Sequence, residues 1–185
     1  MPNSIASITI TANQRVKLIY RSFVSRDINL LVRAFITYVR PILEYNSVTW
    51  SPYYKGDIEC IEKIQRRFTR WLPGFKSLTC NQRLKRLNLP SLELRRLHAD
   101  CYKIVFGLVK LSFTDFFAFR PVTVTRGHQY KLYVNHSRGI RKHFFTGRVV
   151  APWNSLPADT DFSSLNRFKR CINAVDFRKF LTVGV

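Results

Sequence analysis

The chain of 185 residues carries 31 lysines and arginines against 11 aspartates and glutamates, a formal net charge of +20 at pH 7. Hydrophobic residues make up 46% of it and charged residues 23%, which excludes a chain that is disordered throughout and predicts a folded core. Charged residues interrupt every apolar run before it reaches the roughly 18 residues of a spanning helix, so no membrane span is predicted.

Two helices are predicted in the first forty residues. Ala12–Phe23 places apolar residues on one side and basic residues elsewhere, and Asp27–Val39 repeats apolar residues at helical spacing. Ser25 or Asp27 is the expected N-terminal cap of the second helix. Pro41 should end or kink this helix, because proline lacks an amide donor and clashes with the preceding turn.

The clearest element is an amphipathic helix from Asp57 to Leu72, which closes at Pro73 and Gly74. One face is apolar and includes Ile64, Phe68 and Trp71, and the opposite face carries four basic residues within about 100° of the circumference. They are Lys63, Arg66, Arg67 and Arg70. The pattern predicts a helix that packs through one face and meets anions through the other. The alternative is that solvation and complementation of the helix dipole explain the charges.

A shorter helix and a long one follow. Thr79 is the predicted cap of a helix through Leu87, and Ser91 caps a helix whose apolar stripe continues to Leu111. The stripe consists of Leu94, Leu97, Cys101, Ile104, Leu108 and Leu111. A heptad-like stripe this short is typical of an intramolecular core, so the sequence predicts a mainly α fold, a helical bundle.

The pattern of apolar and polar residues changes after Pro121. Tyr130–Val134 alternates like a strand, as do residues 122–125, and a turn at Arg126–His128 separates the two. These features predict a small β-hairpin. The expected organisation is a helical domain over residues 1–120 and a C-terminal appendage over residues 121–185.

The end of the appendage is predicted to be helical again. Gly147 should break the chain before Val149–Leu156, which is expected to form a short turn or helix that ends at Pro157. A final helix begins at Ser163 or Ser164 and carries apolar residues on one face.

Positive charge is concentrated in two stretches that contain no carboxylate. Lys63–Leu92 holds eight basic residues and Phe116–Ala158 holds seven. Such segregation favours an anion-binding surface over one laced with salt bridges. Nucleic acid is the first candidate partner and an anionic membrane surface the second, while simple solubilising charge is the alternative explanation.

The candidate phosphate contacts come from the basic stripe and from shorter clusters after it. They are Lys63, Arg66, Arg67, Arg70, Arg83, Lys85, Arg86, Arg95, Arg96, Arg141 and Lys142. Interleaved aromatic rings can stack on bases, although core packing is the commoner use of such rings. The candidates for stacking are Tyr53, Tyr54, Tyr130, Tyr133 and Trp153.

Local motifs for catalysis or metal binding are missing from the sequence. There is no Asp-Asp pair, phosphate-binding glycine loop, nucleophile elbow or H-E-x-x-H motif. Asp159 and Asp161 lie close together but are typical turn and cap formers. The four cysteines are widely spaced and predict buried thiols, and His98 with Cys101 supplies only two ligands on one helix face. The sequence predicts binding without autonomous catalysis and without a cofactor of its own.

Several blocks of sequence follow one another over nearly the whole chain from about Ala12 onward. They include Tyr38–Tyr45, Val48–Pro52, Glu62–Arg67, Arg83–Arg96, Thr125–His128 and Arg148–Pro157. In order and spacing these blocks resemble the region downstream of the catalytic core in reverse transcriptases of non-LTR retrotransposons, the jockey- and CR1-like LINE elements. No single block is decisive for this family, but the blocks taken together are specific for it.

The resemblance implies a thumb-like helical region and C-terminal tail of an RNA-directed DNA polymerase. In that family a palm domain upstream carries an [FY]-A-D-D motif whose aspartates bind the catalytic metal ions. This sequence contains no such motif, so the resemblance implies a non-catalytic fragment, with Mg²⁺ belonging to a palm that this chain lacks. It also implies that Lys63–Arg70 grips RNA, DNA or an RNA–DNA hybrid as template and primer.

Two alternatives stay open at this stage. The first is a helical docking module that packs on a polymerase palm or fingers domain and has no independent activity. The second is an autonomous polymerase or nuclease, which the missing carboxylate motifs disfavour. Met1–Thr11 shows no secretory signal, and the cysteine pattern fits a reducing compartment, so a nuclear or cytoplasmic location is expected.

Overall fold

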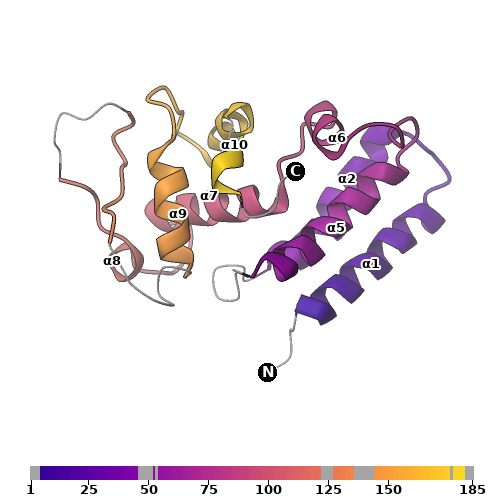
Figure 1. The fold of residues 1–185 in the computed structure, drawn as a ribbon, viewed down its shortest axis with the longest axis horizontal. Helices are drawn as coiled ribbons and strands as arrows, with labels where there is room; N and C mark the ends of the chain where they lie inside the picture. The colour runs from indigo at the N-terminus through magenta and orange to yellow at the C-terminus, as the bar shows by residue number, and fades with distance from the viewer. Residues whose placement is uncertain are drawn as a thin grey trace. The chain divides into compact units, whose positions relative to one another are not determined.

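The structure is a computed structural model that describes residues 5–45, 52, 54–121, 127–135, 144–175 and 177–181 (Figure 1). These residues form α-helices, one short 3-10 helix and one isolated antiparallel bridge, which confirms the mainly helical fold class. They divide into an N-terminal unit that ends at Glu93 and a C-terminal unit over Leu94–Leu181. The boundary expected between residues 120 and 121 falls inside the C-terminal unit.

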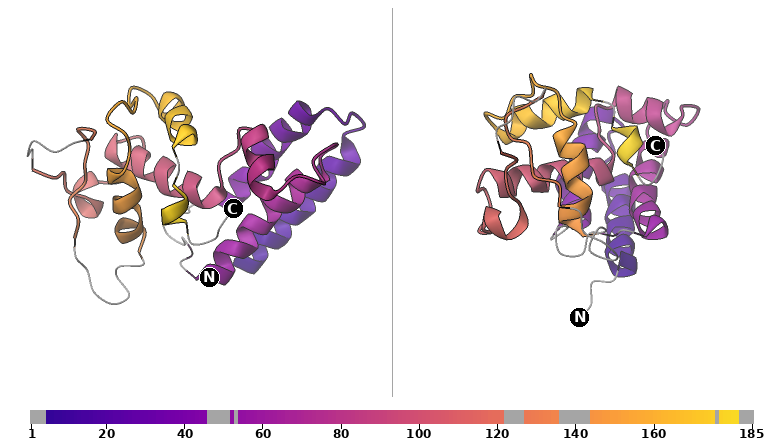
Figure 2. Two further views of the ribbon diagram at one scale, coloured as in Figure 1. Left: turned by 45° about the horizontal axis from the view of Figure 1, so that its top comes forward. Right: turned by 60° about the vertical axis from the view of Figure 1, so that its left-hand side comes forward.

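The helices of the N-terminal unit pack around one apolar core. They are α1 (Ile5–Ser22), α2 (Ile28–Tyr38), α3 (Arg40–Glu44), α5 (Lys55–Trp71) and α6 (Cys80–Arg86). Figures 1 and 2 show α1, α2 and α5 side by side, and α1 contacts both α2 and α5. Within the described ranges, no helix combines the length and apolarity needed to cross a bilayer.

Helix α1 starts earlier than the apolar pattern predicted. The expected start was Ala12, but the helix begins at Ile5. Ile8 lies one turn before Ala12 on the same side, and the two side chains are 8% and 0% exposed. Packing of this face, rather than the weak helix propensity of the Ser/Thr-rich start, therefore fixes the first turns.

Phe68 of α5 lies at the centre of this core. It is fully buried and stacks on Phe35 of α2, with ring centroids 4.4 Å apart. Tyr20 of α1 packs beside Phe68, and its hydroxyl donates to the Phe68 carbonyl at 3.0 Å. The apolar face that the sequence predicted for α5 therefore joins three helices.

The chain between α2 and α3 follows its prediction and adds a buried polar network. Asp27 caps α2, and Pro41 stands in the first turn of the restarted helix. Arg40 is buried, with its Nε 3.7 Å from Glu44 Oε1 and its Nη2 donating to Gln65 Oε1 at 3.5 Å. A buried guanidinium is stable only with such partners, so the network fixes α3 against α5.

Helix α6 begins at the predicted cap. Thr79 Oγ1 accepts the Gln82 amide at 3.3 Å, and Gln82 Oε1 accepts the Thr79 amide at 2.9 Å. This reciprocal capping box satisfies amide donors that the first turn of a helix leaves unpaired.

The C-terminal unit holds most of α7 (Leu92–Val105), then α8 (Phe113–Phe116), α9 (Phe145–Asn154), α10 (Leu165–Ala174) and η2 (Arg178–Phe180). Helix α7 is shorter than predicted. Gly107 adopts a left-handed φ of 64°, and the Leu108 amide donates to the Lys103 carbonyl at 2.8 Å, which closes the helix. Leu108 and Leu111, the last two members of the predicted stripe, are 57% and 43% exposed.

The predicted hairpin is wrong where the structure describes it. Tyr130–Val134 forms no strand, and Leu132 makes an isolated antiparallel bridge with Phe119. Residues 122–126, the other expected strand and the start of the turn, lie outside the described residues. Asn154 takes the place of a partner strand, because its side chain accepts the Leu132 amide and donates to the Leu132 carbonyl, both at 2.8 Å.

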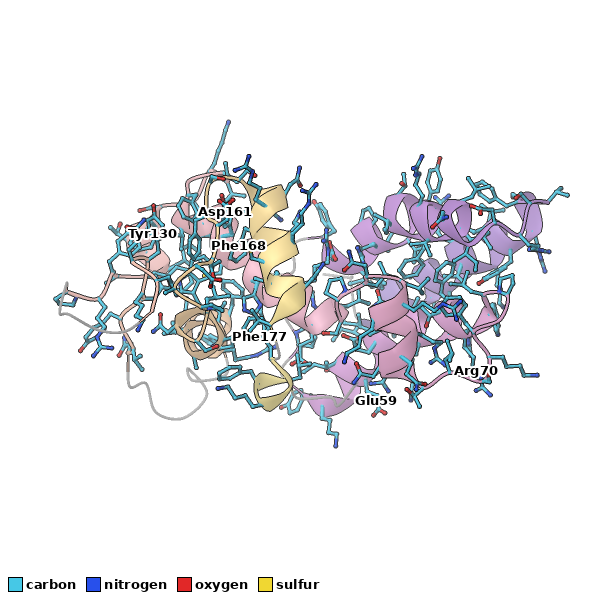
Figure 3. The ribbon with its side chains drawn as sticks, turned by 90° about the horizontal axis from the view of Figure 1, so that it is seen from above. Glu59, Arg70, Tyr130, Asp161, Phe168 and Phe177 are labelled. Carbon is cyan, nitrogen blue, oxygen red and sulfur yellow. The ribbon has the colours of Figure 1, made fainter. Side chains whose placement is uncertain are left out.

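Aromatic side chains form the core of the C-terminal unit, and Figure 3 labels three aromatic residues of this unit, Tyr130, Phe168 and Phe177. The rings in mutual contact include Tyr102, Phe106, Tyr130, Trp153, Phe162 and Phe168. Trp153 is fully buried, and its Nε1 donates to the Tyr130 carbonyl at 2.7 Å. Trp153 is therefore a core residue and not a base-stacking one.

The last helices partly match their predictions. Ser164 caps α10, whose residues Phe168 and Ile172 are buried as expected. Gly147, in contrast, lies inside α9 and does not break the chain there. The intrinsic helix cost of about 1 kcal/mol for glycine is small beside the burial of Val149 and Trp153 on the same helix.

Replacing Phe68 by alanine should lower the free energy of unfolding of the N-terminal unit by about 3–5 kcal/mol, because it leaves a cavity against Phe35. Urea unfolding followed by far-UV circular dichroism measures this loss. Leu18→Ala is the control, since Leu18 is 50% exposed and should change the stability by less than about 1 kcal/mol. Equal losses for the two variants would contradict the central position of Phe68.

Acid should weaken the C-terminal unit through His128. This side chain is buried, its Nε2 lies 2.9 Å from the Trp153 carbonyl, and burial lowers its pKa below the usual 6.5. The unfolded chain therefore binds the proton more readily, so the stability that His128 provides is complete above about pH 6.5 and is lost below it. Urea midpoints at pH 7.5 and 5.5 should differ more for the wild type than for His128→Gln. An equal difference in the two proteins would contradict this role.

Candidate nucleic-acid interface

A concave recess of about 1040 Å³ opens on the surface of the N-terminal unit. It is lined by α1, by the outer face of α5, by the turn after α5 and by α6. The lining residues are Thr9, Asn13, Cys60, Lys63, Ile64, Arg66, Arg67, Arg70, Trp71, Leu72, Lys76 and Arg83. Six of them carry a cationic side chain, and none of these described lining residues carries a carboxylate. We call this feature the basic recess.

The periodicity of α5 gathers the first four cations. Residues three and four apart lie on one face of a helix, so Lys63, Arg66, Arg67 and Arg70 form a continuous stripe. The opposite face is held in the core, so the stripe must face outward. Figure 3 labels Arg70 near the C-terminal end of α5 and Glu59 in the earlier half of that helix. The predicted two-faced character of this helix is confirmed.

Helix α1 forms one wall of the basic recess. Side-chain contacts join Asn13 to Arg67 and Tyr20 to Trp71, so α1 and α5 run in the same direction here. Asn13 Oδ1 accepts from Arg67 Nη1 at 3.4 Å, which orients the guanidinium without neutralising it. This wall is polar but uncharged.

The turn between α5 and α6 supplies one further cation, Lys76, and α6 supplies another, Arg83. Gly74 has a φ of 74°, a conformation that favours glycine, and the turn it makes inserts Phe75 into the core. Lys76 stays exposed beside it. Arg83 lies at the floor, only 7% exposed, and its Nη1 donates to the Leu78 carbonyl at 2.8 Å.

Glu62, the acidic residue of α5 that directly precedes the stripe, is turned into the structure. Glu62 is buried, and its Oε1 accepts the Glu93 amide at 2.9 Å, so the carboxylate caps the start of α7. Within the described part of the chain, no ion pair joins Lys63, Arg70 or Lys76 to a carboxylate. The cations therefore keep their positive potential for a ligand. Exposed ammonium and guanidinium groups on a concave surface suit phosphate oxygens.

The structure separates the residues that the sequence grouped together. Lys85 and Arg86 are exposed on α6 but do not line the basic recess, and the Arg86 guanidinium lies 5.2 Å from the Phe75 ring centroid. Arg95 and Arg96 belong to the C-terminal unit. Arg96 is only 4% exposed, so a phosphate at the surface of this conformation cannot reach its guanidinium. Arg141 and Lys142 lie outside the described residues.

Burial also corrects the interpretation of Arg83 as a surface contact. Its guanidinium bonds to a backbone carbonyl beneath the basic recess, so it adds positive potential from below rather than an exposed donor. Of the predicted stacking rings outside the core, Tyr54 and Tyr133 are 63% and 56% exposed, and neither lines the basic recess. Tyr53 lies outside the described residues.

Sequence reasoning missed Lys76, Asn13 and Trp71 as lining residues. Lys76 belongs to the acid-free stretch, but only the fold of the turn brings it beside α5. Trp71 was assigned to the apolar face, and it is 48% exposed. Nothing in the local sequence of Asn13 indicates its place in the wall.

The described residues form no candidate metal site. Over the residues that the structure describes, no group of three or more His, Cys, Asp and Glu side chains is placed to hold a metal ion. The arrangement that the described residues do provide is a cationic, concave surface, whose charge suits an anionic ligand.

Comparisons with known proteins identify no relative: no family model, no curated protein and no solved structure matches the chain.

Replacing Glu62 by glutamine should lower the free energy of unfolding by about 1–2 kcal/mol, since it converts a buried, charge-assisted hydrogen bond to the first turn of α7 into a neutral one. Glu59→Gln is the matched control on the same helix, because Glu59 is partly exposed and should cost less than about 0.5 kcal/mol. Urea unfolding of both variants checks the difference. A cost for Glu59→Gln that equals the cost for Glu62→Gln would show that the cap contributes nothing.

Proposed function

We propose that this protein binds RNA, DNA or an RNA–DNA hybrid through phosphate contacts in the basic recess and has no catalytic activity of its own. The observation that carries the proposal is the convergence of six cations on one concave surface whose described lining residues include no carboxylate. Cations that neutralise phosphates release condensed counterions, which drives binding without reading sequence.

The size and make-up of the basic recess support an extended ligand over a small metabolite. Its volume of about 1040 Å³ is at the upper end of small-molecule pockets, which hold about 300–1000 Å³ and are mostly apolar. Lys63, Arg67, Arg70 and Lys76 are exposed rather than convergent on one buried point. Flexible cations spread along a wall suit successive phosphates of a backbone.

The resemblance to non-LTR reverse transcriptases gives this binding a context. We infer that the chain is the thumb-like region and tail of an RNA-directed DNA polymerase, whose palm would supply the carboxylates and the Mg²⁺. Two resembling blocks carry contacts that hold the fold: Arg40 pairs with Glu44 in one, and Trp153 and Asn154 bind backbone groups in the other. These contacts give residues of the resembling blocks a structural role in this chain.

A second candidate function is a docking module for such a palm or fingers domain. One observation favours it: large apolar side chains on the outer sides of α1 and α2 are more than a third exposed. They are Ile10, Leu18, Leu30, Ile36 and Tyr38. Self-association that salt does not relieve would favour this function, whereas a salt-sensitive complex with nucleic acid favours the first.

Charge reversal in the basic recess should weaken binding to every nucleic-acid sequence about equally. The variant combines Lys63→Glu, Arg70→Glu and Lys76→Glu, which are exposed positions without a carboxylate partner among the described residues. We expect the slope of log K against log[salt], which is negative, to become shallower by about 2–3, because three phosphate contacts are lost. Fluorescence anisotropy with a labelled oligonucleotide measures the slope.

The matched control reverses three exposed cations that do not line the basic recess: Arg15→Glu, Lys17→Glu and Arg33→Glu. Both triple variants lower the formal net charge by the same amount, so they separate a localised site from general attraction to a basic protein. Equal losses in the two variants, or a salt-independent affinity of the wild type, would overturn the proposal.

A further inference from the structure

Trp71 departs from the face of α5 to which its spacing assigns it. The helix buries Ile64 and Phe68 to 1% and 0% exposure, but Trp71, its last residue, is 48% exposed. Trp71 is also one of the residues that line the basic recess. A large aromatic surface left in water among cations calls for a ligand that offers both negative charge and a flat apolar face.

The indole is held in position from behind. The Tyr20 ring meets it edge to face, with centroids 5.4 Å apart and an interplanar angle of 73°. Tyr20 is itself fixed, because its hydroxyl donates to the Phe68 carbonyl, and burial raises its pKa well above the usual range, which keeps the donor proton in place. A ring that is already immobilised loses little conformational freedom when a ligand stacks on it.

Arg67 lies over the ring at the outer limit of a cation–π contact. Its guanidinium carbon is 5.9 Å from the indole centroid, close to the limit of about 6 Å for such contacts, and 48% of the Trp71 surface stays exposed. The Asn13 side chain accepts from this guanidinium on the α1 wall. The basic recess therefore presents a fixed aromatic surface flanked by a positively charged group one helical turn before it.

We propose that Trp71 stacks on an unpaired base, so that the basic recess takes single-stranded RNA or DNA with Lys63, Arg67 and Arg70 on its phosphates. The inference rests on the proposed function and narrows its ligand. In a duplex each base face is covered by its neighbours, and exposing one costs unstacking energy, whereas a single strand offers its base faces freely.

The test compares ligands that share phosphates and differ in bases. The probes are a labelled dodecamer of deoxythymidylate, an abasic dodecamer of the same backbone and a 12-base-pair duplex, each titrated at fixed low salt. Trp71→Ala should weaken binding of the base-bearing strand by about 5- to 100-fold. It should weaken binding of the abasic strand and of the duplex by less than about 2-fold, because their phosphate contacts do not involve the indole.

Two further variants keep the result interpretable. Trp71→Phe retains an aromatic face and should keep most of the affinity for the base-bearing strand, and circular dichroism shows whether either Trp71 variant has unfolded. Tyr38→Ala removes an aromatic side chain that is 57% exposed on α2 and does not line the basic recess, so it should leave all three affinities unchanged.

The outcomes separate the two proposals. If the wild type binds neither the abasic strand nor the duplex at low salt, phosphate binding in the basic recess fails. If it binds them but Trp71→Ala leaves the affinity for the base-bearing strand unchanged, or weakens all three ligands equally, stacking fails while phosphate binding stands.

Discussion

The two-faced character of α5 is the constraint on which the N-terminal unit depends. Its apolar face stacks Phe68 on Phe35 and ties α1 and α2 into one core. Because that face is buried, Lys63 and Arg70 on the other face have no route inward. Packing of the apolar face of α5 determines both the core of the unit and the direction in which the basic side chains point. The fold and the candidate interface therefore depend on the same helix.

The distribution of carboxylates matters as much as that of the bases. Glu62 lies next to Lys63 in sequence, yet its side chain turns inward and caps α7 by accepting the Glu93 amide. Arg40 and Glu44 likewise pair within a buried network. Glu62 and Glu44 thus help to hold the structure together, and no described residue that lines the basic recess carries a carboxylate.

Local pattern predicts local structure well in this chain and tertiary structure poorly. The caps at Asp27 and Thr79 were predictable, since each depends on residues within one helical turn. The early start of α1 and the place of Trp71 at the rim of the basic recess were not, because both depend on which helix packs alongside. The expected strand at Tyr130–Val134 failed for the same reason: Asn154, distant in sequence, satisfies the backbone of Leu132.

The same division holds for the candidate site. Helical spacing alone placed four cations on one face, whereas Arg96, a predicted phosphate contact, is buried in the structure.

Photo-crosslinking tests most directly whether nucleic acid binds in the basic recess. A thiouridine-bearing oligonucleotide is crosslinked to the intact chain, and the adducts are mapped by mass spectrometry. We expect adducts within residues 60–76 and on α1 near Asn13, because these segments line the basic recess. Adducts confined to the C-terminal unit would contradict it.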